Sequence, residues 1–291
     1  MIRNSSLAFI ATLFALPLSA PDAIAGETVV PANEPIASAP TSGDFFQFTS
    51  TSLTYLYGFN WDTPFAPSSD RDVITIEHFN ANRLGDFFLF VDFINITTEN
   101  RGGPPDSGFD IYGEASPRLS LSKLTGNPIK HGIIKDFYLY SGTFEFGRSK
   151  SLDNINNEFN VGIDTTQLRQ LHGVAVDFDV PGFTVATLNA YWRDDFDIES
   201  STWQLTAAWE LPFAVGDFDF VFKGFADLAG SEGKLEAQFH TCPQLVVDLG
   251  DKLFDKKKFL YFGTEVEIWW NEYGIKDQDD VVPQLIIQGY F

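Results

Sequence analysis

The stretch IYGEASPRLSLSK, residues 111–123, decides the fold because its apolar and polar side chains alternate with a period of two. One face carries Ile111, Gly113, Ala115, Pro117, Leu119 and Leu121, and the other carries Tyr112, Glu114, Ser116, Arg118, Ser120 and Ser122. Successive side chains of a strand point to opposite faces, whereas a helix would mix the two groups. The stretch therefore predicts a β-strand with one apolar face and one polar face.

The same alternation recurs along the chain. It is found in residues 172–180, 202–211, 234–249 and 260–270. Counting the segments that lie between turn-forming residues, we expect twelve strands. They start near Phe45, Asp72, Asp86, Ile111, Ile133, Phe159, Gly182, Ser201, Asp217, Lys234, Phe259 and Val281. Short connections alternate with longer polar ones, which is typical of the two rims of an outer-membrane barrel. The alternation does not define the strand register in residues 156–171 and 250–258. Residues 250–258 form a long connection at a position where the pattern of connections predicts a short turn.

A soluble β-sandwich also alternates, so three further features favour a membrane barrel. Aromatic residues cluster near the predicted strand ends, as in interface girdles (Tyr55, Tyr57, Trp61, Trp269, Trp270 and Tyr273). The polar faces are acidic, and the alternation continues up to Tyr290 and Phe291, as in many outer-membrane barrels. We predict an all-β fold, a transmembrane antiparallel β-barrel of about 12 strands with short periplasmic turns and longer outer loops.

The amino-terminal residues resemble an export signal. Arg3 is followed by an apolar run at 7–18, and Ala23-Ile24-Ala25 fits a cleavage site. An uncleaved anchor is disfavoured because about 12 apolar residues are too few to cross a bilayer, which needs roughly 20. We expect a signal peptide at 1–25, a flexible Pro/Ala-rich leader at 26–43 and the barrel at 44–291. The expected location is the outer membrane of a Gram-negative bacterium.

The charge and the cysteine content exclude several classes of function. The chain holds 19 basic and 40 acidic residues and a formal charge of −21, so nucleic acid is not an expected partner. Its one cysteine, Cys242, excludes an intramolecular disulfide and a multi-cysteine metal site. With 15% aromatic residues, the composition fits a barrel that keeps its acidic and aromatic groups on opposite faces.

Four motifs carry a resemblance to a known family. They are EASPRLSLSKL (114–124), FGRSK (146–150), DFDVPGF (177–183) and the terminal GYF (289–291). In this order and spacing the chain resembles the nucleoside-specific channel-forming porins, also called Tsx-like, over roughly residues 45–291. The resemblance implies a monomeric twelve-stranded barrel that passes nucleosides, some members also serving as phage or colicin receptors. The amino-terminal pore residues match more loosely, through Asp72, Glu77, Asp86 and Asp92.

A twelve-stranded barrel should leave a narrow passage, in which wall side chains set selectivity. The predicted pore-lining residues are Phe88, Phe90, Asp92, Glu114, Arg118, Asp177, Asp179, Gln204, Glu210, Glu236, His240, Glu265 and Glu267, together with Lys223, Gln284 and Gln288. Phe88, Phe90 and Asp92 would share one wall, where a base could stack and ribose hydroxyls could bind a carboxylate. The alternatives are a register slip by one residue, which would turn the rings to lipid, and a structural salt-bridge network joining Glu114 to Arg118.

We therefore expect an outer-membrane channel for passive, selective diffusion of nucleosides or similar small polar solutes, with no cofactor and no bound metal. The expected partners are the solute, outer-membrane lipid and, through Phe291, the barrel-assembly machinery. The main alternative is a receptor or adhesion barrel, such as a phage or colicin receptor. A hydrolase is the weaker alternative, because the chain lacks Gly-x-Ser-x-Gly, His-Glu-x-x-His and Gly-Lys-Ser/Thr motifs and its four histidines are dispersed.

Overall fold

The computed structural model describes residues 45–291 except for 63–68, 95–109, 149–165, 197 and 199. The first part of the sheet comprises β1 (Phe46–Trp61), β2 (Ser69–Asn82), β3 (Gly85–Ile94), β4 (Asp110–Ser120), β5 (Ile134–Arg148), β6 (Thr166–Phe178) and β7 (Val185–Asp195). The second part comprises β8 (Thr202–Val215), β9 (Phe218–Ala229), β10 (Gln238–Thr241), β11 (Gln244–Asp248), β12 (Leu260–Trp270) and β13 (Asp280–Tyr290). The described residues also form two short helices and a 3-10 turn: α2 (Leu121–Thr125), α4 (Gly250–Phe254) and η1 (Glu272–Gly274).

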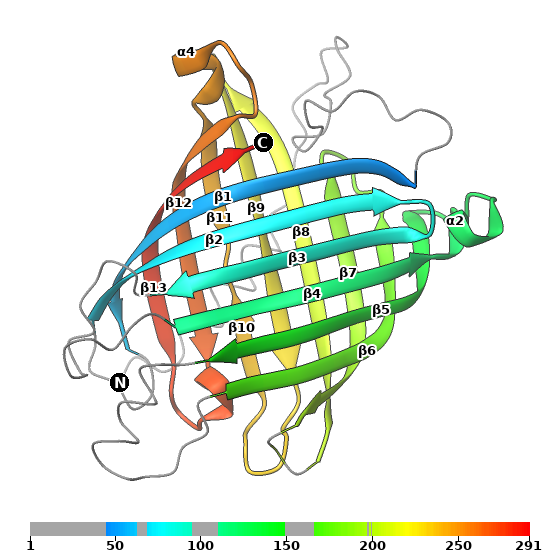
Figure 1. Cartoon of the computed structure of the whole chain (residues 1–291), viewed down its shortest axis with the longest axis vertical. Helices are drawn as coiled ribbons and strands as arrows, with labels where there is room; N and C mark the ends of the chain where they lie inside the picture. The colour runs from blue at the N-terminus through cyan, green and yellow to red at the C-terminus, as the bar shows by residue number, and fades with distance from the viewer. Residues whose placement is uncertain (1–44, 63–68, 95–109, 149–165, 197, 199) are drawn as a thin grey trace. The chain divides into compact units, whose positions relative to one another are not determined.

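The sheet is antiparallel throughout and closes on itself (Figure 1). From β1 to β9 each strand pairs with the next in the sequence, β10 and β11 each pair with β9 and β12, and β13 pairs with both β12 and β1. Because β10 and β11 are two segments of one wall strand, the protein is a closed barrel of 12 strands. The predicted fold class is confirmed, and the predicted strand starts lie within a few residues of the observed ones. The exception is Phe159, which precedes the first described residue of β6.

The strand between β9 and β12 is interrupted at Cys242 and Pro243. Both β10 and β11 pair with β9 and with β12 in one unbroken register, since Thr241 is opposite Ile268 and Gln244 is opposite Glu265. Proline has no N–H to donate to the ladder, so the regular pairing stops there without shifting. The predicted continuous strand over 234–249 is wrong at its start as well, because β10 begins only at Gln238.

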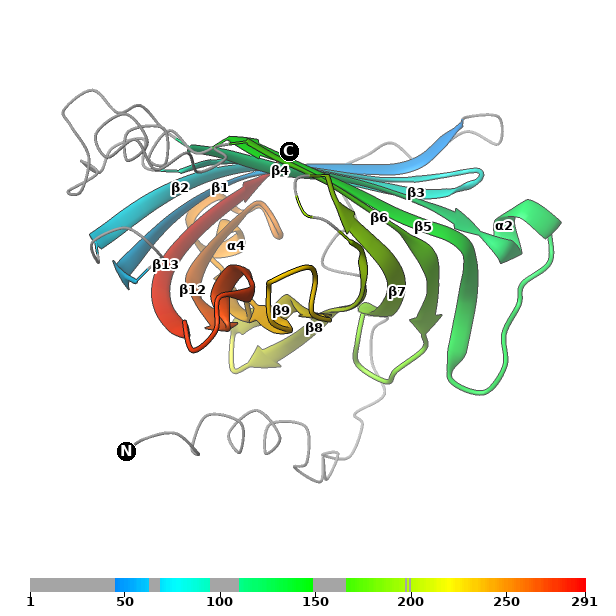
Figure 2. The ribbon, with the colours of Figure 1, turned by 90° about the horizontal axis from the view of Figure 1, so that it is seen from below.

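Two strand ends differ from the sequence expectation. Residues 121–123 continue the alternation but form helix α2, because the Ser120 side chain accepts a hydrogen bond from the backbone N–H of Lys123 at 3.0 Å. The Ser120 hydroxyl in turn donates to Asp136. Helix α2 extends beyond the ends of β4 and β5 (Figure 2). Residues 250–258 hold helix α4, where a short turn was expected.

The two faces of the wall are clearest in β13. Val281, Leu285 and Ile287 are 59%, 44% and 48% exposed, whereas Val282 and Ile286 are fully buried. The exposed face is apolar and therefore suits lipid, while the other face points into the barrel and carries polar groups as well. A row of apolar interior residues links β2 to β9 (Val73, Leu56, Ile286, Val246 and Val221).

Several expectations concern residues outside the described part of the chain. The signal peptide at 1–25, the leader at 26–43 and the strand start at Phe159 all belong to this group. Among the residues that the structure describes, no helix is both long and apolar enough to cross a membrane.

Candidate functional site: the barrel lumen

The inner face of the barrel holds all but two of the predicted pore-lining residues. Hydrogen bonds between strands that are not neighbours identify this face, for example Arg118 on β4 with Thr187 on β7, and Lys223 on β9 with Gln288 on β13. By alternation from these contacts, the inner face holds Phe88, Phe90, Asp92, Glu114, Arg118, Asp177, Gln204, Glu210, His240, Glu265 and Glu267.

Two predicted residues are not on the strand wall. Asp179 follows the end of β6, with a side chain 69% exposed and 4.0 Å from Lys130. Glu236 lies in the connection before β10 and is exposed. Both placements are corrections, and they arise because alternation continues past the strand end, where it no longer sets a face. Trp269, which was expected in an interface girdle, also belongs to the inner face, because it is paired with His240 and stacks on its ring.

One wall of the lumen is aromatic. The ring centroids of Phe88 and Phe90 are 5.9 Å apart, and the ring of Tyr112 on β4 lies 5.8 Å from Phe90. Two carboxylates border these rings on the same face: Asp92 accepts from the Thr75 hydroxyl at 2.5 Å, and Glu114 accepts from the Tyr112 hydroxyl at 2.6 Å. The predicted juxtaposition of rings and carboxylates is therefore present, with Tyr112 as an additional ring.

Arg118 on β4 contacts side chains of four other strands, β3, β5, β6 and β7. Its guanidinium forms a two-point contact with Asp86, with both N–O distances 2.8 Å, and a third contact with Asp177 at 3.1 Å. The Tyr138 ring lies 4.0 Å below it, and the Tyr138 hydroxyl donates to Asp177 at 2.9 Å. Arg118 thus pairs with Asp86 and Asp177 rather than with Glu114.

Two further arginines line the same side of the lumen. Arg169 bridges Glu145, at 2.5 Å, and Asp195, at 2.8 Å. Arg193 on β7 is almost fully buried and donates to the Gln204 side chain at 3.0 Å. Together with Arg118, these side chains form a row of cations on β4, β6 and β7. Each cation contacts the carboxylate or amide oxygens of neighbouring side chains.

The side of the lumen formed by β12 is acidic. Glu265 receives hydrogen bonds from the Gln244 and Gln284 side chains, and Glu267 receives one from the Trp269 indole at 2.8 Å. These donors are neutral, so they orient the carboxylates without supplying a positive charge. Lys223 is directed instead to Gln288, at 2.6 Å, and to the Tyr290 hydroxyl.

Sequence reasoning did not single out several residues of these networks. Tyr138, Glu145, Arg169 and Arg193 lie in segments where a bulge or a weak pattern hides the alternation, such as the irregularity between Tyr138 and Ser141. In the sequence their one signal is the charged or phenolic side chain itself. The structure also brings His240, Cys242 and Glu267 together as a group of possible metal ligands.

A closed antiparallel barrel with an apolar outer face and a charged, aromatic interior defines an outer-membrane β-barrel of the channel type. The family model for the nucleoside-specific channel-forming protein Tsx matches residues 45–280, and the chain belongs to that family. The chain is also similar to the outer membrane protein OmpK of Vibrio parahaemolyticus, with 24% identity over 159 residues. That match covers 53% of this chain and 53% of OmpK, so the chain spans about half the length of this relative.

Proposed function

We propose that the barrel is a passive channel for nucleosides and that the wall formed by β3 and β4 is the place where a nucleoside binds in transit. The aromatic row of Phe88, Phe90 and Tyr112, bordered by Asp92 and Glu114, is the observation that carries this proposal. A nucleobase stacked on one ring gains about 1–3 kcal/mol, and the ring faces accept any of the bases. Family membership supports the same solute class.

The carboxylates supply the second half of the recognition. Ribose hydroxyls donate hydrogen bonds, and carboxylates accept them. Asp92 and Glu114 are held by a threonine and a tyrosine hydroxyl, which leaves each carboxylate with further acceptor capacity for a solute. Acids without a basic partner on β3, β4 and β12 offer acceptors but no donors when ionised, so a phosphorylated nucleoside is bound less well than a neutral one.

Current block in planar bilayers tests the proposal. Neutral nucleosides should reduce the single-channel current in a saturable manner, and nucleotides should do so less. Phe88→Leu with Phe90→Leu keeps the apolar volume but removes the ring faces, so the half-blocking concentration should rise by roughly 10-fold or more, since each stack is worth about 1–3 kcal/mol.

A matched control comes from the same strand. Phe87 is next to Phe88 but belongs to the outer face, so Phe87→Leu should leave the half-blocking concentration unchanged. Equal effects of the inner and outer substitutions would contradict the stacking wall. Block by sugars or amino acids in place of nucleosides would contradict the solute, and a purified barrel without conductance would contradict the channel.

We further propose that residues 1–25 are removed on export, that residues 26–43 form a leader before the barrel, and that the barrel functions as a monomer in outer-membrane lipid. Phe291 is proposed as the contact for the barrel-assembly machinery, and its 72% exposure supports access to a partner. The family is one of channels rather than enzymes, which supports a function without catalysis.

A further inference from the structure

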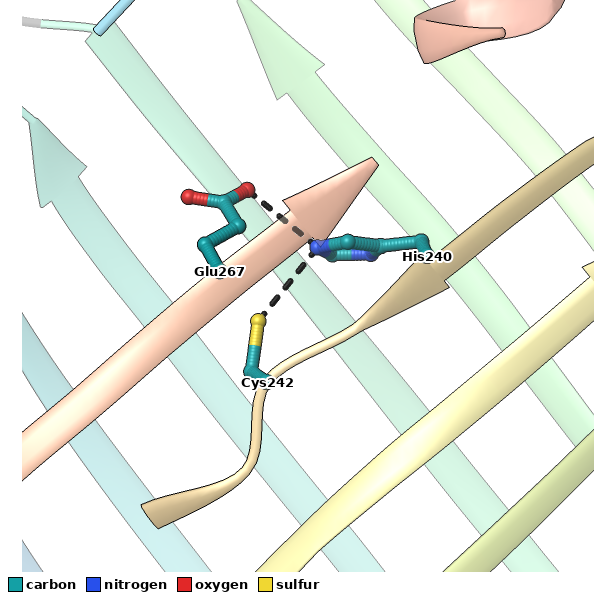
Figure 3. A group of neighbouring side chains, drawn as sticks. All are labelled: His240, Cys242 and Glu267. Atoms are coloured by element: carbon teal, nitrogen blue, oxygen red, sulfur yellow. Dashed lines mark hydrogen bonds and ion pairs between the residues drawn. The ribbon is translucent and has the colours of Figure 1, made fainter. Parts of the chain in front are cut away.

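Three side chains of different chemistry converge at one point on the inner wall (Figure 3). The Nε2 atom of His240 lies 3.2 Å from a carboxylate oxygen of Glu267 and 3.4 Å from the sulfur of Cys242. One ligand atom of each residue lies within 4.8 Å of the others. His240 and Cys242 come from β10 and its end, and Glu267 comes from the neighbouring strand β12.

Hydrogen bonding alone cannot satisfy this arrangement. A single imidazole nitrogen carries either one proton or one lone pair, so Nε2 can serve Glu267 or Cys242 but not both. The 3.2 Å contact is also longer than the 2.7–2.9 Å typical of a charge-assisted hydrogen bond. A nucleophilic triad is disfavoured for the same reason, because the thiol and the acid of a triad address different ring nitrogens.

The distances instead match ligands that share an ion. With metal–nitrogen and metal–oxygen bonds of about 2.0–2.2 Å and a metal–sulfur bond of about 2.3 Å, tetrahedral angles separate nitrogen from sulfur by about 3.5 Å and nitrogen from oxygen by about 3.4 Å. The observed separations are 3.4 Å and 3.2 Å. Two of the three ligand separations therefore match a tetrahedral ion, and the third, from sulfur to oxygen, lies within 4.8 Å.

The surroundings hold the ligands in position. The ring of Trp269 stacks on His240 with centroids 3.7 Å apart and planes 5° apart, and the Phe225 ring meets it edge-on at 5.1 Å. The Trp269 indole also donates to the same oxygen of Glu267 at 2.8 Å. A site whose ligands are fixed in this way loses little conformational freedom when an ion binds.

A second observation points to a cation at this place. Asp227 on β9 is opposite His240 in the register, and its Oδ1 atom is buried and accepts no hydrogen bond from the part of the chain that the structure describes. A buried carboxylate oxygen without a donor is costly unless a positive charge compensates it. Glu265 and Asp92 are further acids in the surroundings of the sulfur.

We propose that His240, Cys242 and Glu267 bind a divalent transition-metal ion of the zinc type inside the lumen. Thiolate, imidazole and carboxylate together suit Zn²⁺ or Co²⁺, whereas Ca²⁺ and Mg²⁺ prefer oxygen ligands alone. On binding, the Cys242 thiol transfers its proton to water and the thiolate donates an electron pair to the ion. The site lies at the end of β10 and three residues before the end of β12, with the fourth position left for water.

Cobalt alone is the probe that tests the site in the intact, detergent-solubilised barrel. Co²⁺ should give a thiolate-to-cobalt charge-transfer absorption in the near ultraviolet, which Zn²⁺ should displace. Cys242→Ser should abolish the band, and His240→Gln should weaken binding of both ions. His172→Gln is the matched control, because His172 lies on the outer face against Trp192 and should leave the band unchanged.

A second measurement does not depend on the spectrum. Cys242 is the one cysteine of the chain, so its alkylation by a maleimide is free of background. Zn²⁺ at 100 times its dissociation constant should slow alkylation about 100-fold, because only the free site reacts. Glu267→Gln and His240→Gln should reduce this protection while retaining the heat-modifiable gel shift of a folded barrel. Absence of both the cobalt band and zinc protection in the folded wild-type protein would overturn the proposal.

Discussion

Removing the Arg118 guanidinium should destabilise the barrel by about 3 kcal/mol, because it leaves two carboxylates facing one another without their cation. Breaking a buried ion pair by deleting one partner costs about 3–5 kcal/mol. The side chains of Arg118, Asp86 and Asp177 are 17%, 9% and 21% exposed, so water in the lumen screens part of the cost and the lower end applies. Arg118→Met preserves most of the packing on the Tyr138 ring, so the loss isolates the charge.

The rescue variant makes this reasoning testable. Adding Asp86→Asn and Asp177→Asn to Arg118→Met removes the unpaired charges, and most of the lost stability should return, to within about 1 kcal/mol of the wild type. Urea unfolding in lipid vesicles, followed by tryptophan fluorescence, measures each free energy of unfolding. If the triple variant is no more stable than Arg118→Met, the loss comes from packing or from the tyrosine contact, and the electrostatic account is refuted.

Three other predictions concern the wall, the rim and the amino terminus. Ile76→Arg, on the outer face near the middle of β2, should lower the stability of the folded barrel in a bilayer by about 2–4 kcal/mol. Val215→Arg, at the end of β8, should lower it by about 1 kcal/mol or less. Equal losses would contradict the proposed position in the membrane. Burial, followed by neighbouring acids, raises the pKa of Glu272 in η1, so the ionised side chain destabilises the native state at neutral pH. Glu272→Gln should therefore increase the free energy of unfolding at pH 8 but not at pH 4, which is below the pKa of a glutamate in the unfolded state. A gain that is the same at both pH values would rule out this charge effect. Mass spectrometry of outer-membrane material should show Gly26 as the first residue, and retention of Met1 would contradict a cleaved signal.

The wall of the barrel could be predicted from the sequence, because each strand must separate lipid-facing from lumen-facing residues at every second position. Leu119 and Arg118 illustrate this, since the neighbours fall on opposite faces as the alternation requires. The alternation is a local property, so it also predicted the faces of Phe88 and Phe90 without any knowledge of the neighbouring strands.

The networks inside the barrel could not be predicted in the same way. Arg118 pairs with residues 32 and 59 positions away in the sequence, and a single sequence contains no information on which acid lies opposite it. The ends of strands were also uncertain, because a capping serine at Ser120 and a proline at Pro243 end regular pairing while the polar pattern continues past them. Asp179 and Glu236 were misplaced for this reason.

The pairing of β1 with β13 has a consequence for how the protein is made. Gln288 donates a hydrogen bond to Thr54, 234 positions earlier, so the barrel closes by one of the longest-range contacts in the chain. Until β13 is in place, β1 and β12 each present an unpaired edge, and such edges recruit other strands. Contacts of this range also form slowly because the loop that they close is long. The nascent chain therefore has to be kept from pairing with other molecules until its last strand arrives, and closure of this seam should be the step that commits it to the membrane.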